Sequence, residues 1–389
     1  MDLSIRREGP HPIYLQIAHY LREHILAGDL PPDTRLETEW KLAQHLGISR
    51  GTVRQALVAL ENEGLVSRIP GKGTYVRGPR SKPRSSSSLI GFMVPYAHDL
   101  LTMEMLAGAE AALKGRGYQL IFCNCEGDQA RQARDTRALL EQGISGLILF
   151  PVDGISSAPT ISWLQEQDFP LVLVDRYLPE ISTDYVVVDN YVGGYKATEH
   201  LILLGHERIG FACTHDRHII TVAHRFAGYR QALEDYHISY HPSWLLEDLE
   251  DINPACVLQN RLTPDQRNRD RALLNAYLQM ENAPDAIFAE NDLVAIRLLR
   301  CSQADGWRVP QDVALVGFDN LNVAANLAVP LTTIHQPKYE VGSQAARILM
   351  DRLERREQNR QQIVLPTTLV IRESCGARLR RRELRRAIA

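Results

Sequence analysis

Seven short apolar runs after residue 88 constrain the fold more than any other feature of the sequence. Near-continuous apolar runs are typical of strands buried on both faces of a parallel sheet. Stretches with helical periodicity lie between most of them, at 103–114, 128–142, 193–204 and 223–234. This alternation predicts a doubly wound α/β fold, and seven strands exceed one small sheet. The runs are residues 89–95, 118–124, 146–151, 170–175, 208–214, 286–292 and 313–319.

Polar side chains gather where four of these predicted strands end. They are Tyr96, His98 and Asp99, then Asp175 and Arg176, then Asn291 and Asp292, and finally Asp319 and Asn320. One aspartate at a strand end is usually only a helix cap. Ligands of doubly wound sheets bind beyond the carboxyl ends of the strands, so four such ends predict a shared cleft. Paired Asp, Asn and Arg side chains near aromatic rings suit a polyhydroxylated ligand.

The N-terminal region has the pattern of three short helices. The first carries an apolar residue at every fourth position from Ile13 to Ile25. Thr38 can cap a second helix that Gly47 ends, and Ser49 can cap a third helix two residues later. Two helices joined by so short a turn predict a helix-turn-helix.

The third helix has one apolar face and one polar face. Val53, Ala56, Leu57 and Leu60 form the predicted buried stripe. The N-terminal end of such a helix meets base edges and phosphates in DNA-binding proteins. A surface helix without any DNA-binding role would show the same stripe, so the pattern alone does not decide. The outward residues near this end are Arg50, Gly51, Thr52, Arg54 and Gln55.

The segment that follows decides in favour of DNA binding. Leu65–Val66 and Thr74–Val76 predict two strands around Pro70–Gly73. A Gly-Lys-Gly tip at 71–73 lets the backbone and one cation approach a DNA groove closely. Between Ser49 and Arg84 there are eight Lys or Arg residues and two acids, although the whole chain has a net charge of -3. We therefore predict a winged helix-turn-helix that attracts phosphates.

Composition places the domain boundaries. Residues 78–88, GPRSKPRSSSS, have little to bury and predict a linker between a head at 1–77 and a body at 89–376. The Arg-rich tail at 377–389 is interpreted as a solvated end. The six cysteines lack metal-ligand spacing, so we expect reduced thiols, even for Cys123 and Cys125. No apolar leader or long apolar run is present, which favours a cytoplasmic protein.

The head resembles the GntR family over residues 10–77. The matching stretches are PIYLQIAHYLREHILAGDLPPDTRL, LAQHLGISRGTVRQALVALENEGLV and GKGTYV. The resemblance implies that Arg50 and Arg54 contact bases or phosphates and that Gly73 lies in the minor groove. Trp40 stands where relatives often have a base-reading arginine, so the operator sequence does not carry over. The implied DNA-binding residues are Thr38, Glu39, Ser49, Arg50, Thr52, Arg54, Gln55, Lys72 and Gly73.

The body resembles the effector domain of the LacI/GalR repressors, a two-lobed periplasmic-binding-protein-like fold. The match covers residues 89–376 and includes HRFAGYRQAL, AIFAENDLVAI and DVALVGFDNLNVAANLAVPLTTIHQP. Together with the head, the chain is similar to AraR-type arabinose repressors. The resemblance implies that Arg225 grips sugar hydroxyls. The implied ligand-binding residues are Tyr96, Asp99, Asp175, Arg176, Thr221, Arg225, Asn291, Asp319 and Gln336.

One segment departs from this resemblance. Residues 249–274 are longer and less regular than the usual segment, so the position of its loop beside the cleft is not predicted. The aromatic residue that often stacks on the ligand near this segment is also unassigned. Leu249 occupies the corresponding position, and Trp244 lies a few residues before it.

These patterns predict a homodimeric DNA-binding regulator, most simply a repressor of sugar-utilisation genes. It would bind palindromic operator DNA with an affinity that a small sugar changes. A sugar phosphate or a nucleobase is the alternative effector. An enzyme fused to a DNA-binding head is disfavoured, because no lysine has a Schiff-base context and no Gly-rich phosphate loop of the kinase type is present. A sugar carrier is disfavoured by the head. We expect no catalytic activity, cofactor, metal or membrane association.

Overall fold

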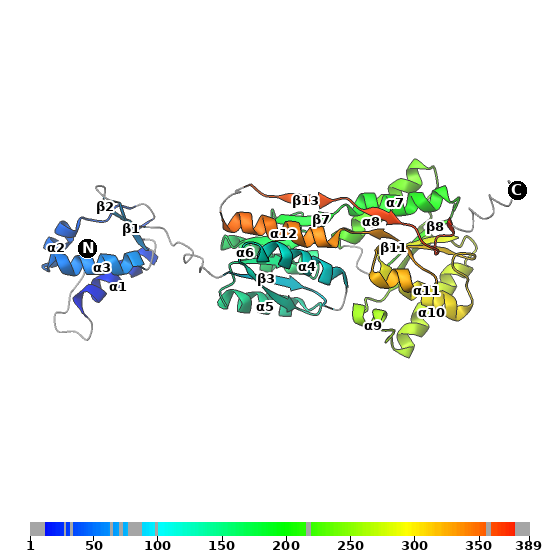
Figure 1. Cartoon of the computed structure of the whole chain (residues 1–389), viewed down its shortest axis with the longest axis horizontal. Coiled ribbons are helices and arrows are strands. Elements are labelled where there is room, and N and C mark those ends of the chain that lie inside the picture. The colour runs from blue at the N-terminus through cyan, green and yellow to red at the C-terminus, as the bar shows by residue number, and fades with distance from the viewer. Residues whose placement is uncertain are drawn as a thin grey trace. The chain divides into compact units, whose positions relative to one another are not determined.

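A computed structural model describes residues 12–26, 29–31, 34–62, 65–69, 73–76, 88–97, 100–214, 219–354 and 359–377. Contacts divide the chain into two compact units, residues 1–87 and 88–389, and each is considered by itself (Figure 1). The predicted linker, apart from Ser88, and the tail from residue 378 lie outside the described residues.

The first unit has its own apolar core, built on three helices and a two-stranded sheet. All four residues of the predicted stripe on α3 are fully buried. The strands pair antiparallel from Val66 opposite Val76 to Ile69 opposite Gly73. This hairpin continues further along its first strand than predicted, because polar Ser67 and Arg68 also join the ladder. The elements are α1 (Ile13–Leu26), α2 (Glu39–Leu46), α3 (Arg50–Asn62), β1 (Val66–Ile69) and β2 (Gly73–Val76).

The second unit contains two six-stranded sheets, which form two lobes. The first sheet has the order β13-β7-β6-β5-β3-β4 and is parallel throughout. The second has the order β14-β12-β11-β10-β8-β9, and only β14 is antiparallel to its neighbour. The first-lobe strands are β3 (Leu89–Val94), β4 (Gln119–Asn124), β5 (Gly146–Leu149), β6 (Leu171–Val174), β7 (Asp184–Val188) and β13 (Gln362–Leu365). The second-lobe strands are β8 (Ile209–Thr214), β9 (Leu245–Leu249), β10 (Ala286–Ala289), β11 (Ala314–Asp319), β12 (Thr332–His335) and β14 (Thr368–Val370).

The chain crosses between the two lobes three times. It leaves the first lobe after β7, returns after β12, and leaves again between β13 and β14. Figure 1 shows β13 running beside β7 in the first lobe, although the two strands lie far apart in the sequence. These crossings make each lobe from separate parts of the chain. They also place the carboxyl ends of the parallel strands of both lobes next to the connecting segments.

A pair of helices packs closely in each lobe, and in the first lobe the two helices come from distant parts of the chain. In the first lobe, α12 packs on α4, and in the second, α7 packs on α8. Both pairs rely on glycine for close approach. A side chain at Gly194 would overlap the backbone of Arg225, and one at Gly228 would overlap the backbone of Tyr191. The helices are α4 (Leu100–Lys114), α5 (Gln129–Glu141), α6 (Gly154–Glu166), α7 (Asn190–Leu203), α8 (Ile220–Asp235), α9 (Pro254–Leu258), α10 (Pro264–Gln279), α11 (Asp292–Asp305) and α12 (Lys338–Leu353).

The structure confirms the α/β fold and all seven predicted strands, each with its ends shifted by no more than a few residues. Four helices, α4, α5, α7 and α8, also lie at the predicted positions. The strands of the body that were not predicted are β7, β9, β12, β13 and β14. Most residues of β7 and β12 are buried, whereas β13 and β14, at sheet edges, have only exposed and half-buried residues. None of the helices in the described part of the chain has the length and apolar character needed to span a membrane.

Gly228→Ala tests the close approach of α7 and α8. The added methyl group must push the helices apart, so we expect the free energy of unfolding to fall by about 1–3 kcal/mol. Chemical denaturation measures this change. Gly115→Ala is the matched control, because a side chain there meets only the carbonyl oxygen of Ala112, at 3.8 Å. Equal stability of Gly228→Ala and wild-type protein would contradict the packing described.

Candidate DNA interface and effector cavity

The head presents the predicted reading edge at the start of α3. Thr38 caps α2 by accepting a hydrogen bond from the Lys41 amide at 3.3 Å, and Gly47 ends that helix with φ of 61°. Ser49 accepts a hydrogen bond from the amide of Thr52 at 3.1 Å, which fixes the start of α3. Residues 50, 51, 54 and 55 are exposed, as predicted. Lys72 lies outside the described residues.

Two arginines of the head share one carboxylate. The guanidinium of Arg54 donates to Glu39 at 3.0 Å, and that of Arg68 lies 3.1 Å from the other Glu39 oxygen. The hydrogen bond from Arg54 is the main reason that the pKa of Glu39 is lowered. Glu39 therefore orients Arg54, a predicted DNA contact, and brings Arg68 of the wing beside it. The role of Arg68 was not predicted, because its isolated position in the sequence carries no signal.

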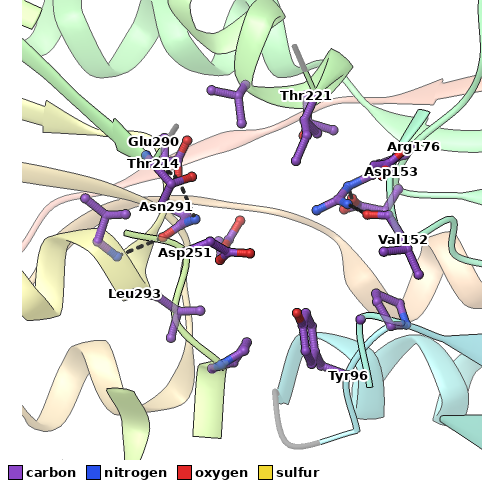
Figure 2. A pocket seen from close by; sticks show the side chains of 18 of the residues that line it. Tyr96, Val152, Asp153, Arg176, Thr214, Thr221, Asp251, Glu290, Asn291 and Leu293 are labelled. Carbon is purple, nitrogen blue, oxygen red and sulfur yellow. Dashed lines mark hydrogen bonds and ion pairs between the residues drawn. The ribbon is translucent and has the colours of Figure 1, made fainter. Parts of the chain in front are cut away.

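The body contains a cavity of about 310 Å³ between its two lobes. It is lined by residues at or just beyond the carboxyl ends of β3, β5, β6, β8, β9, β10 and β11, which is where such sheets bind ligands. Figure 2 shows Tyr96, Asp153 and Arg176 of the first lobe facing Asp251 and Asn291 of the second across an open space. A ligand in this space would therefore contact both lobes at once.

Most of the predicted ligand-binding residues line this cavity. The structure brings together Tyr96, Asp175, Arg176, Thr221, Arg225, Asn291 and Asp319. Asp99 lies outside the described residues. Gln336 was predicted to line the cleft, but it is not among the described residues that do so. It stands behind Asp319 and donates a hydrogen bond to its carboxylate at 2.6 Å.

Arg225 is the most connected of these residues. Its buried guanidinium donates to the Asn190 side chain at 2.8 Å and to the carbonyl oxygen of Glu290 at 2.6 Å. It also lies 3.6 Å from the Asp319 carboxylate and 3.7 Å above the ring of Phe318. Because a guanidinium has five N–H donors, these contacts hold it in place and leave donors for a ligand.

Two of the three crossings between the lobes contact the charged groups of the cavity. Asn190 at the first crossing accepts from Arg225, and Gln336 at the second donates to Asp319. A ligand that binds Arg225 and Asp319 therefore acts on groups that are hydrogen-bonded to the connecting segments.

Backbone strain is concentrated at the strand ends that line the cavity. Asp175 after β6 has φ of 65°, and Asp319 at the end of β11 has φ of 109°. Both values lie in a region that non-glycine residues seldom adopt, and such strain is common at functional sites. Asp175 is buried, and desolvation raises the pKa of its carboxyl.

Glu290 is a buried carboxyl that the sequence analysis did not select. One oxygen accepts from the hydroxyl of Thr214 at 3.1 Å, and the other has no partner among the described residues. Burial raises the pKa of Glu290 to about 7. It lies within the AIFAEND run, directly before Asn291. Only Asn291 and Asp292 were selected at the end of this predicted strand, so the neighbouring Glu290 was missed.

Other cavity residues were also missed. Asp153 follows β5 and caps α6 through the amide of Ser156 at 2.7 Å, so it obeys the same strand-end rule. Asp251 comes from the irregular segment 249–274, whose course carried no periodic signal. Among the described residues, the aromatic side chains that line the cavity are Tyr96 and Phe150.

The two residues considered for a stacking role serve the core instead. Leu249 is fully buried, and the indole of Trp244 donates to the carbonyl oxygen of Asn282 at 2.8 Å. Neither residue lines the cavity. Within the described residues, no group of three or more His, Cys, Asp or Glu side chains is arranged to hold a metal ion.

Comparisons with known proteins agree with both halves of this description. Residues 13–76 match the model of bacterial regulatory proteins of the gntR family, and residues 198–375 match that of periplasmic binding protein-like domains. The chain is 31% identical over 375 residues to the arabinose metabolism transcriptional repressor of Geobacillus stearothermophilus, covering 95% of this chain and 99% of the relative.

Two further relatives extend the comparison. The HTH-type transcriptional repressor PurR of Aliivibrio salmonicida is 30% identical over 295 residues, covering 76% of this chain and 84% of that protein. The solved structure of a transcriptional regulator CelR–cellobiose complex is 25% identical, with a TM-score of 0.64 and coverage of 87% of this chain and 100% of that one.

The head and the two-lobed body define a ligand-responsive DNA-binding transcriptional regulator, a repressor by its relatives. The chain belongs to the gntR family of bacterial regulatory proteins, within the group whose body is a periplasmic-binding-protein-like domain.

Glu290→Gln tests the buried carboxyl. With its pKa raised to about 7, folded Glu290 stays protonated between about pH 4.5 and 7, whereas the unfolded chain ionises there. Rising pH therefore favours the unfolded state of wild-type protein, by a total on the order of 3 kcal/mol above pH 7. Glutamine has no such ionisation, so the stability of the variant relative to wild type should rise from pH 5 to pH 8.

Denaturant titrations at four pH values measure this difference. Glu281→Gln is the control, because Glu281 is exposed and lies outside the cavity. A stability difference between Glu290→Gln and wild type that stays constant with pH would show that the carboxyl is not held neutral.

Proposed function

We propose that the protein represses sugar-utilisation genes and that a neutral sugar, bound between the lobes, changes its affinity for operator DNA. The observation that carries this proposal is the charge balance of the cavity. Among the described lining residues, five carboxyls face three arginines. Hydroxyl groups need both donors and acceptors, which such a wall of carboxylates, amides and guanidiniums supplies.

The same balance disfavours a phosphorylated effector. Each lining arginine already lies near a carboxylate: Arg176 near Asp175 at 3.6 Å and Arg225 near Asp319 at 3.6 Å. The third, Arg297, is paired with Asp270 at 2.7 Å. A phosphate group would therefore find no spare cation in this cavity. The relative aligned over both head and body is named for arabinose metabolism, so pentoses are the first candidates.

The change in DNA affinity would follow from a shift between two populations of the protein. A sugar that contacts both lobes favours the arrangement in which they close on it, and the crossing segments carry that change. We further propose a homodimer on a palindromic operator, because two heads are needed to read two half-sites. The head at 1–77, linker at 78–88 and body at 89–376 are the working division. We also propose that the protein acts in the cytoplasm, where it would bind its operator, and no catalytic role is proposed.

Thermal unfolding of the full chain with a panel of pentoses, hexoses, disaccharides, sugar phosphates and nucleobases tests the effector. A sugar at a hundred times its dissociation constant should add about 2.7 kcal/mol of stability. Arg225→Ala and the milder Thr221→Val should lose this gain. Arg230→Ala is the control, because Arg230 lies on the same helix as Arg225 but outside the cavity. Stabilisation by a nucleobase or a sugar phosphate, and by no sugar, would refute a sugar effector.

Operator binding tests the head. The operator is first selected from random duplexes with wild-type protein, and affinity is then measured by fluorescence anisotropy. Arg50→Ala should weaken binding by about 1–3 kcal/mol, because it removes an exposed cation at the N-terminal end of α3. Arg230→Ala removes the same charge from the body and should bind as wild type does. If Arg50→Ala binds the operator as tightly as wild type does, Arg50 is not part of the DNA interface.

A further inference from the structure

A second cavity, of about 60 Å³, lies in the second lobe between α10, α11 and the segment after α9. Four of its lining residues are arginines, Arg267, Arg271, Arg297 and Arg300, and Asp270 is the only carboxylate among the described residues that line it. We propose that this cavity binds a phosphate group and that its occupancy modulates the effector cavity. Its walls come largely from residues 249–274, the segment that the family resemblance left unexplained.

Only two of the four arginines are neutralised. Arg297 forms a bidentate pair with Asp270 at 2.7 and 2.8 Å, and Arg271 donates to Asp305 at 2.9 Å. The other two donate to backbone carbonyls. Arg267 donates to the carbonyl oxygen of Leu262 at 2.6 Å, and Arg300 donates to that of Val257. Neither of these two arginines forms an ion pair with a carboxylate of the described residues. The cavity therefore has two positive charges in excess.

The position of Arg300 makes its charge costly without an anion. Its side chain is half-buried, and it donates to the carbonyl oxygen of Val257 at 2.5 Å. Desolvation lowers the pKa of this guanidinium, so burial opposes its charge. An anion in the cavity would compensate that cost. The volume is several times what one water molecule needs, which is room for a small oxyanion.

The charge excess favours phosphate over a carboxylate. Two uncompensated guanidiniums match a phosphate dianion, whereas a carboxylate would neutralise only one of them. Guanidiniums also donate to phosphate oxygens in pairs, which gives strong and directional hydrogen bonds. Free phosphate and a phosphorylated metabolite offer the same group, and the experiment below separates them.

The second cavity shares structure with the effector cavity. Arg297 lines both cavities, and it donates to the carbonyl oxygen of Glu250 at 2.7 Å. The segment from Asp251 to Val257 lines the effector cavity, and the carbonyl oxygen of Val257 accepts from Arg300. An anion that draws Arg300 or Arg297 toward it therefore acts on one wall of the effector cavity. Coupling of this kind is reciprocal.

Isothermal titration of inorganic phosphate into the full chain, at constant ionic strength, tests the anion site. The variants are Arg300→Gln, Arg267→Gln and the double variant. Arg269→Gln is the control, since it removes an arginine of α10 that does not line the cavity. Any phosphate that binds to the head does so equally in wild type and in every variant, so it does not affect the comparison. We expect at least tenfold weaker binding at one site in the double variant and wild-type binding in the control.

Identical phosphate isotherms for wild type and the double variant would overturn the proposal. Arg267 is exposed, so its replacement keeps the test valid if Arg300→Gln fails to fold. A parallel titration with glycerol 3-phosphate identifies the source. Binding at least tenfold tighter than inorganic phosphate, and lost in the double variant, assigns the site to a phosphorylated metabolite. Equal affinity assigns it to free phosphate.

The coupling to the effector cavity rests on the proposed function and is tested separately. Phosphate should change the affinity of the wild-type protein for the sugar found in the thermal panel by at least threefold. The same measurement in the double variant should show no change. An unchanged sugar affinity in wild type, despite phosphate binding, would overturn the coupling and leave the anion site. Failure to find any sugar would instead refute the proposed function, while the phosphate titrations would still decide the anion site.

Discussion

The buried guanidinium of Arg225 is the interaction on which the effector cavity depends. A cation in an apolar interior is stable only when its hydrogen bonds and charge are matched. Here the partners come from three places: Asn190 at a crossing between the lobes, the backbone at Glu290, and Asp319 at the end of β11. Satisfying one side chain therefore sets the relative positions of α7, α8 and two strand ends. Gly194 and Gly228 allow α7 and α8 to lie close enough for this arrangement.

A second buried ion pair organises the outer part of the same lobe. Arg297 and Asp270 join α11 to α10, and the third guanidinium nitrogen of Arg297 donates to the carbonyl oxygen of Glu250, just after β9. Removing one partner of such a pair typically costs about 3–5 kcal/mol, because the other charge stays buried. The irregular segment 249–274 is thus held by charge pairing and backbone hydrogen bonds more than by a periodic apolar face. It delivers Asp251 to one cavity and Arg267 to the other.

Most of the strands that apolar burial dictates could be predicted from the sequence, although the mostly buried β7 and β12 were not among them. Strands such as Gly146–Leu149 are buried along their whole length, so their composition is distinctive. Strands such as β13 lie at an edge, alternate exposed with half-buried residues, and pair with a strand far away in the chain, which no local pattern reveals.

The same physical distinction applies to the candidate site. Residues at the ends of buried strands, such as Asp175 and Asn291, could be placed together because the topology brings strand ends to one edge. Gln336 has its place behind Asp319 only because β12 lies beside β11, so its supporting position could not be read from composition. The pairing of Arg54 with Glu39 likewise depends on how two helices meet, fifteen residues apart.

The three crossings between the lobes also have a consequence for biosynthesis. During translation from the N-terminus, the head has its complete set of elements before the body begins. The first lobe, however, lacks α12 and β13 until the ribosome has passed residue 365, after nearly all of the second lobe has been made. Until then β7 is an open edge, and the helix that packs on α4 is missing. An unpaired parallel edge is prone to association with other chains. The nascent first lobe therefore keeps this edge exposed until residues 338–365 have been made.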